Sequence, residues 1–348
     1  MPIIKTVTLR TIALELGLSV ETVYKALKGK PGMSETTRQL VVKTAENLGY
    51  FTKEQVLSLR ADRVIPFSAD RKRFLLLTTS PSNNFYSLLL QGLRERFTTL
   101  GHHIDMLQLP SKIKAASMRE WMDDNGLEFT DGLFVAPNLI PQEWEPNLLQ
   151  LKVPIILLGY PKLGTRVDSV IWDIYEATFL AVDYLRSIGH RNIMYVGDTN
   201  RQHRGYVLRW LAFLHAMDEF RAGVNPEFHS IGDRSVNIHW LEELREKLIR
   251  NSPTAIICGI DGEVPAVFKL ITELGLRIPD DISLIGLLNE QPELLPPFTM
   301  PLLAIRETGY RAADRMLWRI ANPSLPYEHI RIHGELLIGS TTSVNNRA

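Results

Sequence analysis

The chain has 348 residues, with 39 Lys and Arg against 39 Asp and Glu, so its formal net charge is zero. This length exceeds one ordinary domain and predicts a small domain joined to a larger α/β unit. No apolar run approaches the roughly 18 residues that a membrane span needs, and no signal peptide is evident, so we expect a cytoplasmic protein without a membrane partner. The single cysteine, Cys258, lies in an apolar run and excludes an internal disulfide.

The charges are unevenly distributed along the chain. Residues 1–73 hold 13 Lys and Arg against 7 Asp and Glu, whereas the remaining residues hold 26 against 32. A basic segment attracts nucleic acid, and an acidic remainder limits nonspecific adhesion to the same polyanion. The N-terminal segment is therefore the candidate for DNA binding.

Three short amphipathic segments follow one another between Val7 and Tyr50. We expect helices at 9–16, 20–28 and 35–48, capped by Thr8, Ser19 and Ser34. Apolar residues at helical spacing give each helix an inward face, and a core this small leaves most of the second helix exposed. Such a helix suits the major groove of DNA, but periodicity alone equally allows a three-helix cap with a solvated charged face.

These segments closely resemble the DNA-binding headpiece of the lac repressor family of bacterial regulators. The motifs that carry the resemblance are Val7-Thr8-Leu9, Ile12-Ala13, Gly17-Leu18-Ser19, Thr22-Val23, Ser34 to Arg38 and Leu48-Gly49-Tyr50. The resemblance implies a helix-turn-helix headpiece at 1–52 and a hinge or linker at 53–73. The residues expected to contact DNA are Thr8, Ser19, Val20, Glu21, Thr22, Tyr24, Lys25, Lys28, Thr36 and Leu59.

The start of the second helix is expected to determine which bases are read. Val20 can contact a thymine methyl group. Glu21 can accept a hydrogen bond from cytosine, and the alternative is that it stabilises the helix N-terminus as a first-turn acid. Tyr24 and Lys25 replace a common Ser-Arg pair, and lysine lacks the guanidinium fork that reads guanine. The residues expected at phosphates are Thr22, Lys28 and Thr36.

Leu59 matches a leucine that, in the family, enters the minor groove from a hinge helix and unstacks a base step. Several neighbouring positions depart from the family pattern, namely Thr52, Lys53, Val56 and Leu57. Two roles are therefore consistent with the sequence at Leu59, namely insertion as a wedge into the minor groove and a plain linker contact.

From Phe74 onward, short apolar strands alternate with helices. We expect strands at 74–78, 104–109, 132–136, 153–159, 170–172, 192–196, 255–258 and 283–286. We expect helices at 85–100, 174–188, 207–219, 241–251, 264–274 and 308–320. This alternation is typical of parallel sheets covered on both faces and built by right-handed crossovers.

The same family resemblance extends over this part of the chain, through motifs such as Asn84-Phe85-Tyr86, Asp173 and Gly189 to Ile193. It implies a periplasmic-binding-protein-like core at 74–348 that consists of two doubly wound α/β lobes joined by three crossing strands. The first lobe would hold 74–173 and 303–326, and the second would hold 174–302 and 327–348.

A core with two lobes binds a small molecule between them, at the carboxyl ends of the strands. The residues that we expect at the effector are Asn84, Phe85, Tyr86, Asp173, Arg209, Asp261 and Asn289. Helix-start packing is the alternative for Phe85 and Tyr86, and a helix cap is the alternative for Asp261.

Two departures make a free hexose a less expected effector than the family implies. Sugar-sensing members carry Asp where this chain has Leu287-Leu288-Asn289, and they often carry Asn where it has Ile260. An unpaired sugar hydroxyl costs on the order of 1–3 kcal/mol. A less polar or anionic ligand, or no ligand, is then the alternative to a typical sugar.

The sequence contains no nucleophile elbow, no phosphate-binding Gly-rich loop and no His/Cys cluster with metal-ligand spacing. We therefore expect no catalytic residue, no metal, no cofactor and no enzyme activity. The expected function is that of a homodimeric regulator, acting as a repressor of a carbohydrate-related operon. It would bind a pseudo-palindromic operator and respond to an effector that either induces or co-represses. The alternative is a cytoplasmic sugar-binding protein or sugar-metabolising enzyme with a helical appendage that does not bind DNA.

Overall fold

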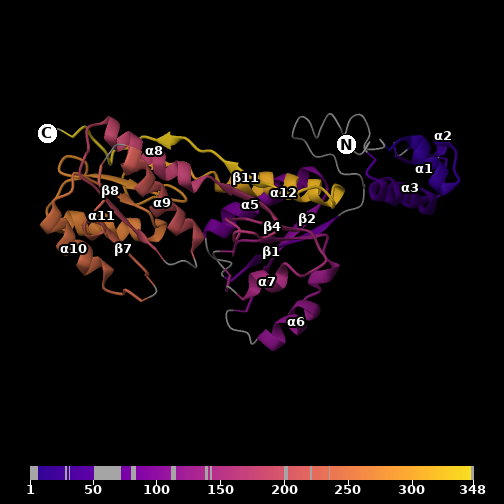
Figure 1. Cartoon of the computed structure of the whole chain (residues 1–348), viewed down its shortest axis with the longest axis horizontal. Helices are drawn as coiled ribbons and strands as arrows, with labels where there is room; N and C mark the ends of the chain where they lie inside the picture. Colours follow the sequence, from indigo (N-terminus) through magenta and orange to yellow (C-terminus); the bar gives the residue numbers. More distant parts are fainter. Residues whose placement is uncertain are drawn as a thin grey trace.

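The structure is a computed structural model of the chain, and it describes residues 7–27, 30, 32–50, 72–79, 84–110, 115–137, 140–141, 143–199, 203–219, 222–234 and 236–345. Three N-terminal helices precede two parallel sheets with helices on their faces, so the predicted α/β fold class is confirmed (Figure 1). No helix in these described ranges is long and apolar enough to cross a membrane.

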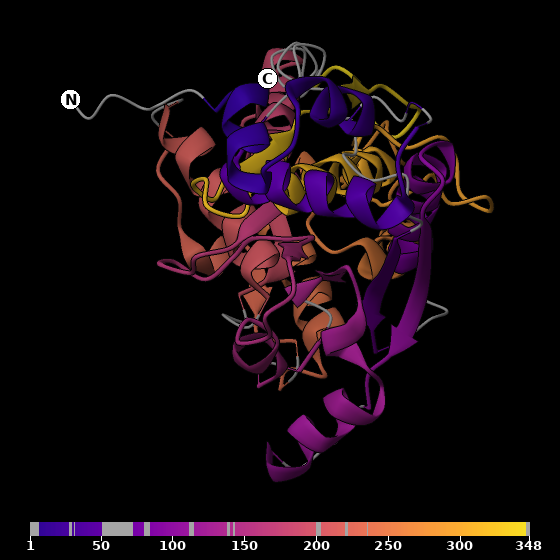
Figure 2. The same ribbon diagram turned by 90° about the vertical axis from the view of Figure 1, so that its right-hand side faces the viewer.

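The headpiece consists of α1 (Leu9–Leu16), α2 (Val20–Leu27) and α3 (Glu35–Leu48) (Figure 2). Thr8 caps α1 because its hydroxyl accepts a hydrogen bond from the Thr11 amide, and Gly17 ends the helix with φ of 63°. The predicted bounds of α1 and α3 are confirmed. The small core that joins the three helices is Ile12, Ala13, Val23, Ala26, Val41 and Ala45.

The first lobe contains a six-stranded parallel sheet with the order β11-β5-β4-β3-β1-β2. Its strands are β1 (Arg73–Thr78), β2 (His103–Gln108), β3 (Gly132–Val135), β4 (Ile155–Leu157), β5 (Asp168–Trp172) and β11 (His329–Ile332). One face packs against α5 (Asn84–Thr99) and α12 (Ile305–Ala321), and the other packs against α6 (Ala115–Asp124) and α7 (Trp144–Leu148).

Two glycines allow α5 and α12 to cross at close range. A Cβ atom at Gly92 would lie 1.9 Å from the carbonyl oxygen of Arg306, and one at Gly309 would lie 2.2 Å from that of Leu89. A larger residue at either position would therefore push the helices apart.

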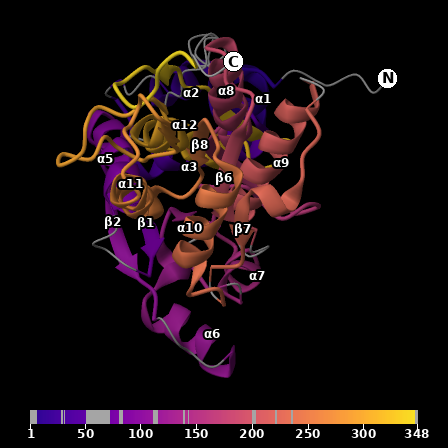
Figure 3. The ribbon, with the colours of Figure 1, turned by 90° about the vertical axis from the view of Figure 1, so that its left-hand side faces the viewer.

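The second lobe contains a four-stranded parallel sheet with the order β7-β6-β8-β9 (Figure 3). Its strands are β6 (Ile193–Asp198), β7 (Ser230–Gly232), β8 (Ala255–Cys258) and β9 (Ser283–Gly286). One face packs against α8 (Ile174–Ser187) and α9 (Arg204–Glu219), and the other packs against α10 (Trp240–Asn251) and α11 (Val264–Glu273).

The chain passes between the lobes after β5, after β10 (Met300–Pro301) and after β11, and β10 pairs antiparallel with β12 (Leu336–Leu337). The expectation that all of 327–348 belongs to the second lobe is wrong for β11. This strand pairs in parallel with β5, with Ile330 opposite Val170, so it extends the edge of the first sheet. Six further elements were not predicted from the sequence, namely β7, β10, β11, β12, α6 and α7.

His229 should make the second lobe sensitive to acid. Its Nδ1 accepts a 3.0 Å hydrogen bond from the Tyr195 amide, which requires a ring nitrogen without a proton. Burial lowers the pKa of His229 to about 4. An unfolded histidine titrates near pH 6.5, so the unfolded state gains a proton first as the pH falls. The contribution of neutral His229 to the free energy of unfolding is therefore complete above pH 6.5 and is lost as the pH falls toward 4.

We expect the free energy of unfolding in urea to decrease by roughly 2 kcal/mol between pH 7 and pH 5 on account of His229. His229→Gln retains an acceptor for the Tyr195 amide but has no titrating ring, so it should show a smaller decrease. Equal pH dependence in the two proteins would contradict this assignment.

Candidate functional site

The exposed side of α2 carries the residues that were expected to read bases. Val20 and Tyr24 are 44% and 41% exposed, whereas Val23 and Ala26 on the opposite side are buried in the headpiece core. Ser19 fixes the start of the helix, because its hydroxyl accepts a 3.0 Å hydrogen bond from the Thr22 amide. The headpiece thus presents one face of α2 to a partner.

Glu21 and Lys25 form an ion pair on this face, with 2.8 Å between Oε1 and Nζ. The hydrogen bond from Lys25 lowers the pKa of the Glu21 carboxyl. Both side chains are exposed, so solvent screens the pair and little free energy is needed to separate it. Lys25 can therefore exchange its partner for a base or a phosphate, and Glu21 can exchange its partner for a base.

Two further cationic side chains contact α2 or the segment that follows it, and neither was among the predicted DNA contacts. Lys30 lies over the ring of Tyr24 at 5.1 Å, and Arg38 donates to the carbonyl oxygens of Ala26 and Lys30 at 3.2 and 2.8 Å. Arg38 belongs to a motif that carried the family resemblance, so its position could have indicated this role.

The remaining predicted DNA contacts differ in how far the structure describes them. Thr8 forms the cap of α1, and the hydroxyl of Thr36 lies 3.1 Å from that of Ser34 at the start of α3. Lys28, Leu59 and the hinge up to residue 71 lie outside the described residues.

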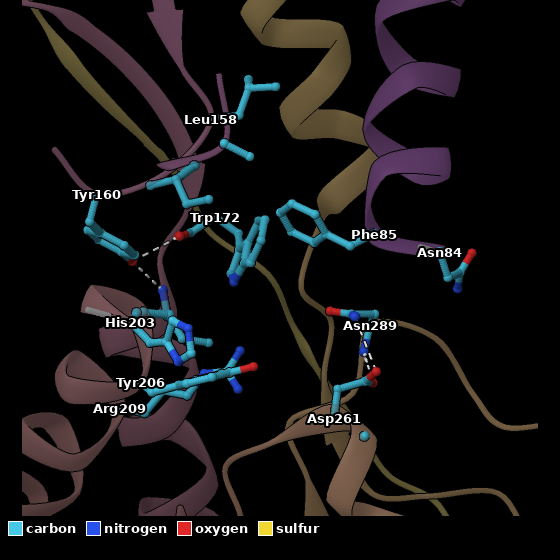
Figure 4. A pocket seen from close by; sticks show the side chains of 15 residues that line it. Asn84, Phe85, Leu158, Tyr160, Trp172, His203, Tyr206, Arg209, Asp261 and Asn289 are labelled. Atoms are coloured by element: carbon cyan, nitrogen blue, oxygen red, sulfur yellow. Dashed lines mark hydrogen bonds between the residues drawn. The ribbon is translucent and has the colours of Figure 1, made fainter. Parts of the chain in front are cut away.

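A cavity of about 410 Å³ lies between the two lobes (Figure 4). Five of the seven predicted effector residues line it, namely Asn84, Phe85, Arg209, Asp261 and Asn289. The lining residues that were not predicted from the sequence are Ala136, Leu158, Tyr160, Ile171, Trp172, Ile174, His203, Gly205, Tyr206 and Gly262.

Tyr86 and Asp173 do not line this cavity, which corrects the prediction for both residues. Tyr86 is 1% exposed in the core of the first lobe, and burial raises its pKa to about 12. Asp173 caps α8 by accepting hydrogen bonds from the amides of Tyr175 and Glu176, both at 3.1 Å. Both residues therefore have structural roles beside the cavity.

The first lobe contributes an aromatic wall. The rings of Phe85 and Trp172 meet edge to face with 5.3 Å between their centroids. The hydroxyl of Tyr160 accepts from the Ile174 amide at 2.8 Å and donates to the Trp172 carbonyl at 3.0 Å, and burial raises the pKa of Tyr160. Trp172 ends β5 and Tyr160 shortly follows β4, so the rule that ligands bind at the carboxyl ends of strands could have found both.

The second lobe contributes the charged groups. Asp261 accepts two hydrogen bonds from Asn289, at 2.7 Å from the backbone amide and at 3.2 Å from the side chain. Burial raises the pKa of the Asp261 carboxyl. Arg209 donates to the carbonyl oxygen of Gly259 and lies 5.2 Å from the centre of the Tyr206 ring. A carboxylate and a guanidinium thus face the aromatic wall.

Polar contacts join the lobes on both sides of the cavity. Arg204 donates to Glu145 at 2.5 and 3.3 Å and to the Tyr160 carbonyl at 2.8 Å. Asn84 donates to Glu290 at 2.6 Å. A ligand that moves either lobe must strengthen, strain or break these contacts.

Residues 182–342 match the family of periplasmic binding protein-like domains. The chain is 26% identical over 322 residues to the catabolite control protein A of Priestia megaterium, covering 91% of this chain and 93% of that protein. It is 24% identical over 344 residues to the HTH-type transcriptional repressor PurR of Histophilus somni, strain 129Pt, covering 95% and 97%.

Two solved structures share the fold over nearly the whole chain. The complex of the transcriptional regulator CelR with cellobiose has a TM-score of 0.65 and 20% identity, and the match covers 96% of this chain and 99% of that one. The lac repressor dimer bound to its operator and the anti-inducer ONPF has a TM-score of 0.63 and 19% identity, and covers 97% and 100%. The similarity therefore includes the N-terminal helices as well as the two lobes.

Proposed function

Because this chain belongs to the lac repressor family of transcriptional regulators, we propose that its headpiece binds a pseudo-palindromic operator and that its cleft binds a small-molecule effector. The chain is a DNA-binding regulator of transcription and not an enzyme, since relatives that match it over almost its whole length are named as regulators. A capped, exposed α2 on its own small core is the observation that supports the operator contact.

The proposed protein is a homodimeric repressor that acts in the cytoplasm at the nucleoid. Its domains are a headpiece at 1–52, a hinge at 53–73 and a core at 74–348, with β11 now assigned to the first lobe. Two headpieces related by a two-fold axis would contact the two halves of the operator. The proposed DNA contacts are the ten residues named from the sequence.

The proposed effector is a sugar or a sugar derivative, because the related regulator CelR is described with cellobiose. Asn84, Phe85, Arg209, Asp261 and Asn289 are the residues proposed to contact it. A ligand that alters the separation of the lobes would alter the separation of the headpieces, so the affinities for operator and effector are coupled reciprocally.

A mobility-shift titration tests the DNA-binding proposal. Full-length protein is used to select operators from random duplex DNA, and its affinity is then measured at several salt concentrations. We expect the selected operator to bind at least about 10³-fold more tightly than unrelated DNA, with an affinity that falls steeply as salt increases. Equal affinity for selected and unrelated DNA would refute the proposal.

Lys25→Ala should relax the preference of the protein for one base pair. Lys25 lies on the exposed face of α2, and a lost base contact is worth about 1–3 kcal/mol of discrimination. Lys28→Ala, which removes an expected phosphate contact, should instead weaken all sequences alike. Both variants are compared by repeating the operator selection, and uniform losses for both would mean that Lys25 contacts only the DNA backbone.

A further inference from the structure

Two buried hydrogen-bond donors of residues that line the cavity have no partner within the described residues. They are Nε1 of Trp172 and Nε of Arg209, in residues that are 7% and 5% exposed. Trp172 belongs to the first lobe and Arg209 to the second, so the two side chains border the cavity from opposite lobes (Figure 4). Because buried polar groups are nearly always paired, these two donors indicate a place for a ligand acceptor.

The carboxylate that lines the cavity is already engaged. Both oxygens of Asp261 accept hydrogen bonds from Asn289, which lies in the short segment where sugar-sensing family members carry an Asp. Two buried polar atoms of the lining residues lack a partner in the described structure, and both atoms are hydrogen-bond donors. A ligand rich in donors would leave them unpaired.

We propose that the effector is a sugar acid, a pyranose ring that carries a carboxylate in place of a neutral CH₂OH group. This inference rests on the proposed effector-binding function of the same cavity. The carboxylate accepts hydrogen bonds from Arg209 and Trp172, and the guanidinium supplies the compensating positive charge.

The other walls of the cavity suit the rest of such a ligand. The apolar face of a pyranose ring packs on the edge-to-face pair of Phe85 and Trp172. Its hydroxyl groups face Asp261 and Asn289, whose oxygens retain lone pairs for additional hydrogen bonds. Arg209 remains near the carboxylate end because its bond to the Gly259 carbonyl fixes the guanidinium.

Matched ligand pairs test this proposal. The affinities of full-length protein for glucuronate and glucose, and for galacturonate and galactose, are measured by isothermal titration calorimetry. The two members of each pair differ only in the group at C6. We expect the acid of at least one pair to bind about tenfold or more tightly than its neutral partner, because a hydrogen bond to a charged group is stronger than one to a neutral group.

Two substitutions locate the carboxylate. Trp172→Phe keeps an aromatic ring but removes the Nε1 donor, so it should lower the affinity for the acid about tenfold and change the difference between acid and neutral sugar. Arg209→Gln should abolish the preference for the acid. Trp210→Phe is the matched control, because Trp210 lies on the same helix as Arg209 but does not line the cavity.

Three results would overturn the proposal: neutral hexoses that bind as tightly as their acids in both pairs, failure of both acids to bind at millimolar concentration, or an unchanged preference for the acid in Trp172→Phe. Trp172→Phe keeps the test decisive even if Arg209→Gln does not fold. The same preparations are assayed for operator binding. Selective operator binding without acid binding refutes only the ligand class, whereas acid binding without selective operator binding refutes only the DNA-binding proposal.

Discussion

Replacing Asp168 with alanine should destabilise the first lobe by about 3–5 kcal/mol, because it removes the carboxylate that two buried guanidinium groups share and leaves only the half-exposed Glu328 to pair with Arg315. Asp168 is fully buried at the start of β5. Its Oδ1 accepts from Arg315 at 2.6 and 2.9 Å, and its Oδ2 accepts from Arg319 at 2.5 Å. Urea unfolding of the purified protein measures the loss.

The position of this cluster explains why the effect should extend beyond one ion pair. Arg315 and Arg319 lie on α12, and Asp168 also accepts a 2.9 Å hydrogen bond from the Glu328 amide just before β11. Arg319 further donates to the carbonyl oxygens of Asn322 and Leu325, at 3.0 and 2.8 Å. The cluster therefore fixes the turn that brings β11 to the edge of the first sheet.

Glu95→Gln is the control for this prediction. Glu95 on α5 pairs with Arg306 on α12 at 2.6 Å, but both side chains are about half exposed. An exposed pair is screened by water and salt, so we expect little change in stability. A loss below about 1 kcal/mol for Asp168→Ala would show that the cluster does not stabilise the lobe as argued.

The difference between local and distant contacts explains which strands could be predicted from the sequence. β8 and β9 were predicted to the residue, because each is a short apolar run whose side chains are all buried. β11 was missed because its residues alternate between exposed and half-buried positions, and because it is held in the first sheet by Asp168, which lies some 160 residues earlier. Its place in the fold depends on contacts that no local pattern contains.

The candidate site divides in a similar way. Arg209 and Asp261 were predicted from the family resemblance, and both line the cavity. Asp173 was misassigned because a residue at a crossover can equally cap the next helix, and its carboxylate is used by the amides of α8. Tyr160 and Trp172 of the aromatic wall also belong to the buried core of the first lobe, so their ring chemistry alone did not distinguish them from core residues.

Val41→Asp should abolish selective operator binding, while the effector-binding core at 74–348 continues to bind its effector. Val41 is fully buried among the six residues of the headpiece core. A charge at this position has no buried partner, and a core of six small side chains has little stability to lose. We expect operator affinity to fall to that for unrelated DNA, a decrease of about 10³-fold or more.

Leu40→Asp provides the matched control at the adjacent position. Leu40 is 52% exposed, so the new carboxylate remains in water and α3 should remain folded. Both variants add one negative charge to the headpiece, so the general electrostatic loss of DNA affinity is the same for both. The difference between them then measures how far DNA binding depends on the folded headpiece core. If Val41→Asp still binds the operator selectively, DNA binding does not depend on the headpiece core. If the same variant loses effector binding, the effector-binding core does not fold independently of the headpiece.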